Sequence, residues 1–286
     1  MYYVLYNPKA GGNTGEEKAR KLDELLQGES LNYNSVFDVK DYKAFLEELQ
    51  PEDKIVIVGG DGSLNYFVND IRGMELKNEV LFYAGGTGND FLNDLGKDPE
   101  HGPYEITKYL KDLPSVTIDG YDWLFLNGVG YGIDGYCCEV ADQMHAAGET
   151  NVNYASIAIK GLLGKFKPRN AKITVDGKEY KFRKVWIAAA MNGRYYGGGM
   201  KNAPNQDRLN PERKLTLVVW HGSGKVKTLM MFPSIFKGEH VQHTKNVALM
   251  EGYDITVEFD SPCALQIDGE TVLAVTKYEA KSSKLI

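Results

Sequence analysis

Short apolar runs alternate with polar, helix-spaced segments along the first third of the chain. Tyr2 to Tyr6, Ile55 to Val58 and Val80 to Ala84 have the apolar, β-branched and aromatic character of buried strands, and each runs into a loop that contains glycine. Apolar residues at helical spacing fill much of the chain between these runs. This alternation predicts an N-terminal α/β domain with a Rossmann-like parallel sheet covered by helices.

Local signals place the helices of this domain. Thr14 and Glu17 have the spacing of a capping box ahead of apolar positions 19, 22, 25 and 26. Asp41 is expected to cap a second helix, which ends before Pro51. The pattern from 104 to 110 predicts a third helix after the last strand.

The pattern changes after Pro114 to short strands separated by Gly-rich and Asp-Gly turns. Residues 172–182, with Asp176-Gly177 at their centre, predict a β-hairpin. Further strands are expected at 255–259, 264–267 and 271–275, and helices near 135–145, 154–163 and 225–236. We therefore expect a first domain at 1–115 and a β-rich, sandwich-like second domain at 116–275. The segment 276–286 either returns to the first domain or stays with the second.

Composition and charge narrow the classes of protein. The 286 residues include 33 Lys and Arg against 39 Asp and Glu, and the net charge of −6 does not favour nucleic acid as a partner. Three cysteines, two of them adjacent, give neither a disulfide framework nor a zinc-site spacing, which indicates a cytoplasmic protein. The first residues do not resemble a signal peptide, and no run approaches the ~18 apolar residues of a membrane span. Membrane contact would then be peripheral, at the inner face. The oligomeric state stays open, a homodimer included.

The glycine loops after the predicted strands suit a phosphate. Glycine at the carboxyl end of a parallel strand allows close approach of the backbone, and a helix that starts there presents free N–H groups to an anion. Gly59 to Asn65 and Gly85 to Asp90 both have this layout, and Asn7 to Gly12 follows a third strand. Complete P-loop and G-x-G-x-x-G fingerprints are absent. A single such loop is explained equally well by packing, but three favour a nucleotide or phosphate site.

Five motifs in order resemble the diacylglycerol kinase catalytic domain family and its bacterial lipid kinase relatives, which are related to the sphingosine and ceramide kinases. They are NPKAGG at 7–12, GGDGSLN at 59–65, GGTGNDF at 85–91, NGRYYGGGM with the following AP at 192–204, and QIDGE at 266–270. Each motif is short, but together they cover almost the whole chain.

The resemblance implies an NAD kinase or diacylglycerol kinase type of fold, with a nucleotide-binding first domain and a lipid-substrate second domain. It implies ATP and Mg²⁺ as cofactors, a lipid such as diacylglycerol as acceptor, and Asp268 or Glu270 as catalytic base, with Asp268 weakly favoured. Nucleotide contacts are implied for Asn7, Pro8, Lys9, Gly59, Gly60, Asp61, Gly62, Ser63, Leu64, Asn65, Gly86, Thr87 and Asn89. Water-mediated Mg²⁺ binding is implied for Asp61, Asp90 and Asp119.

Some of these residues have a simpler interpretation. Asp-Gly pairs also occur at 61, 119, 134 and 176, so Asp268-Gly269 by itself reads as a turn. The chain also departs from the family pattern at Leu209 to Lys214, where an acidic LDDG stretch normally supplies a second, structural metal site, and near Asp38-Val39, where a threonine normally touches nucleotide.

A basic stretch, two histidines and the adjacent cysteines lie outside these motifs. Residues 160–184 hold nine Lys and Arg against two acidic residues, and Leu162, Leu163 and Phe166 lie beside them. This stretch is either an anionic-membrane contact or a solvated face of the sheet. His240 and His243 are expected at the surface, and the adjacent cysteines in the core.

The sequence as a whole predicts an ATP- and Mg²⁺-dependent lipid kinase that phosphorylates a hydroxyl of diacylglycerol or a similar neutral lipid. One alternative is a kinase of the NAD type acting on a soluble dinucleotide, against which the later motifs argue. Another is a nucleotide-binding regulatory protein with little turnover, which the missing LDDG acids suggest.

Overall fold

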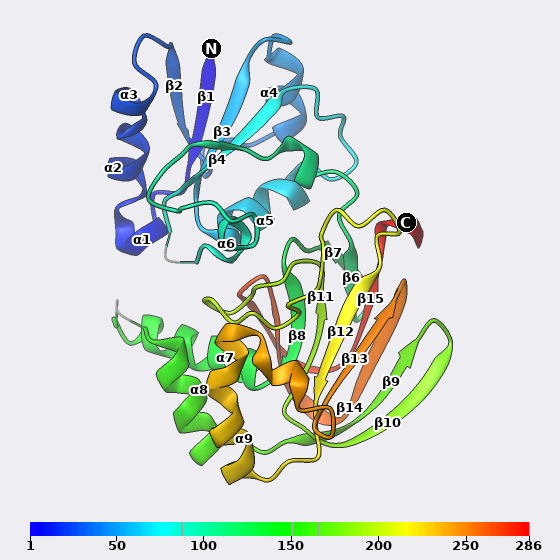
Figure 1. Cartoon of the computed structure of the whole chain (residues 1–286). Helices are drawn as coiled ribbons and strands as arrows, with labels where there is room; N and C mark the ends of the chain where they lie inside the picture. The colour runs from blue at the N-terminus through cyan, green and yellow to red at the C-terminus, as the bar shows by residue number, and fades with distance from the viewer. Residues whose placement is uncertain (87, 150–151, 165, 286) are drawn as a thin grey trace. The chain divides into compact units, whose positions relative to one another are not determined.

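The computed structural model describes residues 1–86, 88–149, 152–164 and 166–285, and in the second helix of the second unit the side chains from 156 on. The chain forms two compact units, Met1–Lys111 and Asp112–Ile286 (Figure 1).

The first unit is built on a five-stranded sheet. Strand order is β2-β1-β3-β4-β5, with the first four strands parallel and β5 antiparallel to β4. The strands are β1 (Tyr2–Tyr6), β2 (Leu31–Ser35), β3 (Lys54–Gly59), β4 (Glu79–Ala84) and β5 (Tyr104–Glu105). Because the chain leaves β1 toward β2 but later continues from β3 to β4, the sheet has its topological switch point between β1 and β3.

Helices cover this sheet because alternate strand residues are apolar on both of its faces. Val4, Val56 and Val58 pack with Ala19 and Leu22 from the helices that follow β1, whereas Phe82 meets Phe91 on the other face. The helices are α1 (Ala10–Asn13), α2 (Gly15–Arg20), α3 (Leu22–Leu25), α4 (Tyr42–Glu48), α5 (Asp61–Asp70) and α6 (Asp90–Asp94), with a 3₁₀ turn at Thr107–Tyr109.

The helix signals were correct in part. Asp41 caps α4 by accepting a hydrogen bond from the Ala44 N–H at 3.0 Å, as expected. Thr14 forms no capping box, because its hydroxyl instead donates to the Gly11 carbonyl at 2.9 Å. The helix predicted at 104–110 is wrong: this segment adds β5 to the edge of the sheet, and the Thr107 hydroxyl accepts the Val80 N–H at 2.8 Å.

The second unit is dominated by one antiparallel sheet. Its order is β13-β12-β11-β8-β14-β15-β6-β7, and the β9–β10 hairpin joins it through β14. The strands are β6 (Ser115–Ile118), β7 (Tyr121–Leu124), β8 (Gly128–Gly132), β9 (Arg169–Val175), β10 (Lys178–Val185), β11 (Ile187–Met191), β12 (Leu215–Trp220), β13 (Val247–Gly252), β14 (Asp254–Ile267) and β15 (Glu270–Lys281). The C-terminal strand β15 pairs with β14 and β6, so it stays in this unit.

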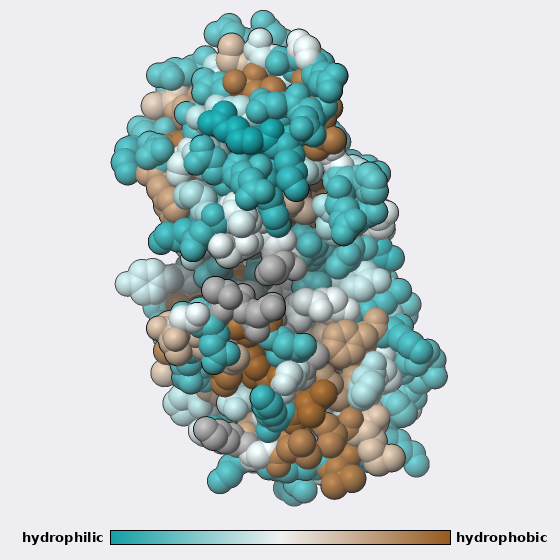
Figure 2. Space-filling view, turned by 90° about the vertical axis from the view of Figure 1, so that its left-hand side faces the viewer, coloured by the Kyte–Doolittle hydropathy of each residue, from teal (hydrophilic) through white to brown (hydrophobic). Residues whose placement is uncertain are grey.

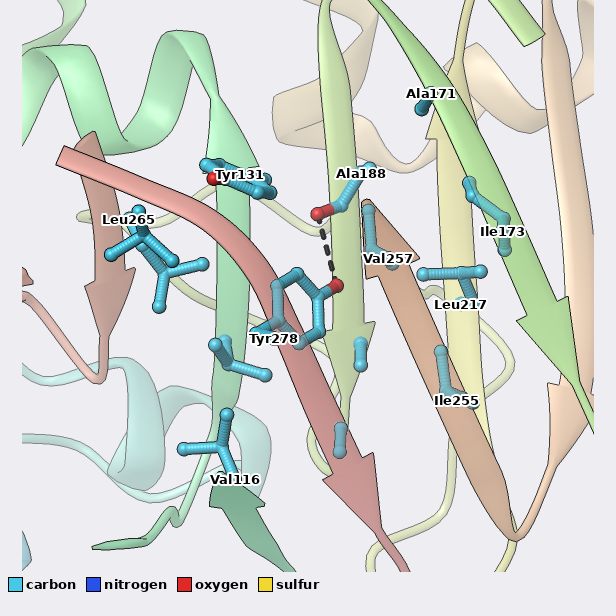
Figure 3. Close-up of a cluster of buried hydrophobic side chains, with 14 of the residues drawn as sticks. Val116, Tyr131, Ala171, Ile173, Ala188, Leu217, Ile255, Val257, Leu265 and Tyr278 are labelled. Carbon is cyan, nitrogen blue, oxygen red and sulfur yellow. Dashed lines mark hydrogen bonds between the residues drawn. The ribbon is translucent and has the colours of Figure 1, made fainter. Parts of the chain in front are cut away.

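The long strand β14 pairs with β9 near its start and with β8 near its end, which folds the sheet over its own core. Side chains from facing strands fill this core, and the Tyr278 hydroxyl donates to the Ala188 carbonyl within it at 3.2 Å (Figure 3). The sandwich-like second domain expected from the sequence is therefore present, and pairs of strands distant in sequence enclose its core.

A second core lies between the sheet and a layer of helices. Trp186, Met191 and Trp220 from the sheet pack against Ile133, Leu162 and Phe232 from the helical segments. These segments are α7 (Ile133–Ala146), α8 (Tyr154–Leu163), α9 (Lys225–Met231) and 3₁₀ turns at Phe232–Lys237 and Glu239–Gln242, and a separate 3₁₀ turn at Ser283–Leu285 follows β15. In the part of the chain that is described, no helix is both long and apolar enough to span a bilayer.

The expected surface position of His240 is wrong. Its side chain is fully buried, its ring stacks on Trp220, and its Nε2 donates to the Asn202 carbonyl at 3.0 Å. Burial lowers the pKa of His240 to about 4, so the ring is neutral at physiological pH. Cys137 and Cys138 are core residues, as expected.

Candidate functional site

The loops after β3 and β4 lie against each other. A β-carbon at Gly86 would lie 2.8 Å from the Gly60 backbone, and one at Gly59 would lie 2.4 Å from the Ser63 side chain. The Gly85 N–H donates to the Gly59 carbonyl at 2.8 Å, which continues the ladder between the strands into the loops. Glycine is therefore required at these positions for close backbone approach.

The β1 loop joins these two at the switch point of the sheet. The Asn7 side-chain amide donates to the Ser63 hydroxyl at 3.2 Å, and the Lys9 N–H donates to the Asn7 side-chain oxygen at 3.0 Å. A β-carbon at Gly11 would lie 2.7 Å from the Gly85 carbonyl oxygen. Residues predicted from three separate motifs thus meet at one edge of the sheet, which is where ligands bind in open α/β folds.

The start of α5 is arranged for an anion. This ten-residue helix begins after Gly60, and no side chain of the described residues caps it. N–H groups in a first helical turn have no acceptor within the helix, and the helix dipole adds positive potential there. Gly62 and Ser63, both partly exposed, lie in this turn. The arrangement can bind phosphate oxygens through the backbone.

Asp61 links the β3 loop to α6. Its carboxylate accepts the N–H groups of Asp90 at 2.8 Å and Phe91 at 3.1 Å, and Asp61 and Asp90 are both buried. Asp61 therefore stabilises the start of α6 as well as lying beside the phosphate loop. Leu64 and Asn65, further along α5, are buried in the unit.

Two neighbouring features bear on a ligand. The Asn89 side-chain oxygen is buried and has no hydrogen-bond partner among the described residues. The exposed Phe37, which no motif pointed to, lies under the Lys9 ammonium at 5.2 Å.

Thr87, expected beside the phosphates, lies outside the described residues. Asp119, expected near Mg²⁺, occupies the exposed β6–β7 turn of the second unit with φ +50°. Within the described parts of the chain, no three His, Cys, Asp or Glu side chains gather in a metal-binding group.

Asp268 and Glu270 have different surroundings in the second unit. Asp268 forms the β14–β15 turn at φ +48°, followed by Gly269 at +97°. Its buried carboxylate accepts the N–H groups of Leu126 at 2.5 Å, Asn127 at 2.8 Å and Gly128 at 2.9 Å. Glu270 is the first residue of β15 and is exposed. Asp268 thus fixes the turn to the segment before β8, and Glu270 projects from that turn.

Polar residues hydrogen-bonded around this turn support its position. The Arg208 guanidinium donates to the Leu126 carbonyl at 3.2 Å and to the Asn127 side chain at 3.0 Å, and the Asn192 amide donates to the Leu126 carbonyl at 2.8 Å. Asn192 starts the NGRYYGGGM motif, whose consecutive glycines 197–199 have φ between +61° and +96°. Motifs from 192 and 266 therefore meet at the segment 126–128.

Asp134 is a further acidic residue that the motifs did not single out. It lies in the first turn of α7, is 3% exposed, and faces the side chains of Tyr196 and Gln266. Burial raises the pKa of Asp134 to about 7, and these neighbours offset only part of that effect. The signal that could have found it is Gly132-Ile-Asp-Gly, another glycine-flanked aspartate directly after an apolar strand.

Two family models match the chain, and together they follow the order of its two units. Residues 1–118 match the diacylglycerol kinase catalytic domain, and residues 127–280 match the YegS C-terminal NAD kinase beta sandwich-like domain. The chain is 27% identical over 198 residues to "Diacylglycerol kinase" of Mycobacterium tuberculosis, an alignment covering 66% of this chain and 62% of that protein's length. It is 22% identical over 306 residues to "Putative lipid kinase YtlR" of Bacillus subtilis, covering 99% of this chain and 96% of the relative.

The fold is shared with a solved structure. A crystal structure of a diacylglycerol kinase from Bacillus anthracis superimposes with a TM-score of 0.66 at 22% identity, covering 99% of this chain and 94% of the other. With both domain matches in sequence order and together spanning nearly all of its length, the chain belongs to the diacylglycerol kinase catalytic domain family with a YegS-type C-terminal domain.

Proposed function

We propose that the protein is an ATP- and Mg²⁺-dependent lipid kinase that transfers the γ-phosphate of ATP to a hydroxyl of diacylglycerol or a similar neutral lipid. The observation that carries this proposal is the meeting of three glycine loops at the switch point of the first unit's sheet, beside the uncapped start of α5. Membership of the diacylglycerol kinase catalytic domain family supports the reaction class.

In this proposal the phosphates of ATP contact the first turn of α5 and the β1 loop. Asn7 and Ser63 already hold the two loops together, and Lys9 supplies a positive charge at the same edge. Backbone N–H groups that are fixed before the substrate arrives need no reorganisation as charge shifts in the transition state.

Residues at the start of α6 fit a Mg²⁺ held partly through water. Asp61 and Asp90 supply carboxylates there, and the buried Asn89 oxygen is an acceptor suited to a cation or a bound water. When bound, Mg²⁺ would neutralise charge on the phosphates. Asp119 stays a proposal as a further member of this network.

Glu270 is proposed as the general base, in preference to Asp268. Three N–H groups already bind the Asp268 carboxylate, and protonation of Asp268 would break that arrangement. Glu270 would take the proton of the acceptor hydroxyl while that oxygen bonds to the γ-phosphorus and ADP leaves. Asp268 would act as a positioning residue that fixes the turn.

The lipid acceptor must be taken from a membrane, and the helix layer of the second unit offers a contact surface. Ile159 and Leu163 on α8, and Val226 and Met230 on α9, are exposed apolar pairs spaced by four residues. In Figure 2, where this layer faces the viewer, hydrophobic side chains gather over its lower part. Lys160, Lys225 and Lys227 are exposed on the same two helices. We propose that this face docks on an anionic membrane surface, at the inner face of the membrane, where ATP is present.

The test of the reaction measures transfer of labelled phosphate from ATP to diacylglycerol, ceramide, sphingosine or NAD in detergent micelles. We expect transfer to a neutral lipid, and a loss of roughly 10² to 10⁴ in rate for Glu270→Gln, the usual contribution of a general base. Glu279→Gln, on the same strand, is the matched control and keeps the wild-type rate. Absence of transfer to every lipid would refute the proposal, and transfer to NAD alone would support a soluble dinucleotide kinase instead.

The test of membrane docking measures co-sedimentation with vesicles containing phosphatidylglycerol. Met230→Asp places a charge on the apolar face and is expected to abolish binding, whereas Tyr121→Asp, at an exposed position on β7, leaves binding unchanged. Wild-type binding should weaken as salt rises because surface charges are screened. Binding that is absent, or equal in Met230→Asp, contradicts this docking face.

A further inference from the structure

The basic stretch 160–184 divides into two groups in the structure. On the β9–β10 hairpin, Lys172 lies 3.6 Å from both Glu179 and Glu258, and Lys181 lies 3.6 Å from Glu179. Lys167 and Arg169, by contrast, line a cavity at the start of β9. The excess positive charge of the stretch is therefore partly neutralised on the hairpin but kept at this cavity.

This cavity has a volume of about 430 Å³ and is walled by α7, the segment after α8, and the middle of β14 and β15. Phe166, Pro262 and Leu273 give it apolar walls, and Leu273 is 61% exposed at its rim. None of the lining residues that the structure describes belongs to the nucleotide loops, and neither Asp268 nor Glu270 is among them.

An irregularity in the β14–β15 ladder opens the cavity. Glu258 pairs with Lys277 and Cys263 with Val275, so β14 has three extra residues over this interval. On β15, Ala274 has φ +58°, a conformation that costs a non-glycine residue roughly 1–2 kcal/mol. Strain of this kind persists only where the surrounding structure imposes it, and it often accompanies binding sites.

Arg169 is the key polar group of the cavity. Its Nε is buried and has no hydrogen-bond partner within the described residues. Glu139 is the one acidic residue in the described lining, and no ion pair within 4.0 Å joins it to Arg169 there. Arg169 and Lys167 therefore leave the described lining with a net positive charge.

We propose that this cavity binds the headgroup of one anionic phospholipid. Its phosphate would pair with Arg169 and Lys167, and the glycerol and first acyl carbons would lie on Phe166, Pro262 and Leu273. A small soluble anion would leave the apolar walls in water, and a neutral lipid would leave the charges of Arg169 and Lys167 without a counterion. The site would hold one membrane lipid at a fixed place on the second unit. This specific binding differs from the non-specific electrostatic attraction between a basic protein surface and an anionic membrane.

Titration calorimetry with dihexanoyl phosphatidylglycerol, kept below its micelle concentration, tests this site without ATP. We expect saturable binding of one lipid per chain. Arg169→Gln should weaken it roughly tenfold or more, as expected for loss of a charge-assisted hydrogen bond. Lys181→Gln removes the same charge from the ion-paired hairpin and should leave affinity unchanged. Because nothing is phosphorylated, failure here and failure of the kinase proposal are separate results.

Two fragments of the lipid test the two halves of the proposal. Glycerol 3-phosphate lacks the acyl chains, and dihexanoylglycerol lacks the phosphate, so neither should bind measurably at the same concentration. Glycerol 3-phosphate binding as tightly as the lipid would overturn the lipid assignment, and equal binding of dihexanoylglycerol would overturn the anionic one. No saturable binding of the phospholipid, or equal weakening by Lys181→Gln, would overturn the site itself.

Cys263 gives a local readout. It lines the cavity and is partly exposed, whereas Cys137 and Cys138 are buried. Burial raises the pKa of Cys263 to about 12, so alkylation is slow and can be followed by mass spectrometry over hours at pH 8.5. Dihexanoyl phosphatidylglycerol should slow alkylation of Cys263 in the wild type and not in Arg169→Gln. Alkylation unaffected by lipid in the wild type contradicts binding in this cavity.

Discussion

The buried carboxyl of Asp134 should make the second unit less stable as pH rises. Folding raises the pKa of Asp134 from 3.8 to about 7, so the folded state holds a proton that the unfolded state releases. The contribution of Asp134 to the free energy of unfolding is fully present below pH 3.8 and is lost as the pH rises through 7. With about 1.4 kcal/mol per pKa unit, the loss is roughly 2 kcal/mol at pH 5 and roughly 4 kcal/mol at pH 8.

Asp134→Asn removes this dependence while keeping the shape of the side chain. Relative to wild type, the variant should therefore gain roughly 2–3 kcal/mol in free energy of unfolding between pH 5 and pH 8. All three tryptophans, Trp123, Trp186 and Trp220, belong to the second unit, so tryptophan fluorescence in urea follows the unfolding of that unit alone.

Asp142→Asn is the matched control, because its side chain is exposed on the same helix and stays in water in both states. It should follow the wild-type pH dependence. A difference between Asp134→Asn and wild type that is equal at pH 5 and pH 8 would show that the folded protein does not keep Asp134 protonated near neutral pH, and the reasoning would fail.

Three further changes test other parts of the structure. Folding lowers the pKa of His240 from 6.5 to about 4, so on acidification the unfolded state binds this proton first, and the free energy of unfolding should fall by roughly 3 kcal/mol between pH 8 and pH 4. In urea titrations, His240→Gln should lose less stability than wild type over this pH range. An equal loss in the two proteins contradicts the buried neutral ring. Asp268→Asn turns one acceptor into a donor facing an N–H group and should lower the free energy of unfolding by roughly 1–3 kcal/mol, and wild-type stability would mean that these hydrogen bonds contribute little. Gly86→Ala should weaken nucleotide binding in calorimetry because its β-carbon meets the Gly60 backbone at 2.8 Å, whereas Gly88→Ala, at 3.4 Å from the Asp61 side chain, is the milder control; equal effects would argue against the close loop contact.

Much of the fold follows from local patterns. Apolar β-branched runs such as 55–58 form the central strands, and Asp176-Gly177 forms a hairpin turn with φ +48° and +79°, because both depend on residues adjacent in sequence. The helices near 135–145, 154–163 and 225–236 were also predicted correctly by their periodicity. The segment 104–110 was not, because its pairing with an edge strand overrides its helical pattern.

The candidate site could be predicted only in part. The motifs identified which loops carry glycine and acidic residues, but not what those residues contact. Asp268 binds N–H groups about 140 positions away in sequence, and that contact is what distinguishes it from Glu270. The burial of Asp134 and of the Arg169 Nε could not be predicted from the sequence, since burial depends on the packing of many segments.

The sequence by itself determined the alternation of strands and helices, the glycine loops after β1, β3 and β4, and the family to which the chain belongs. These are properties of neighbouring residues, because backbone conformation and amphipathic period are set locally. Only the tertiary structure decided which acidic side chains are hydrogen-bonded, buried or exposed, and where Arg169 and Lys167 lie beside apolar walls. Those properties arise from long-range contacts that exclude water, and no local pattern records them.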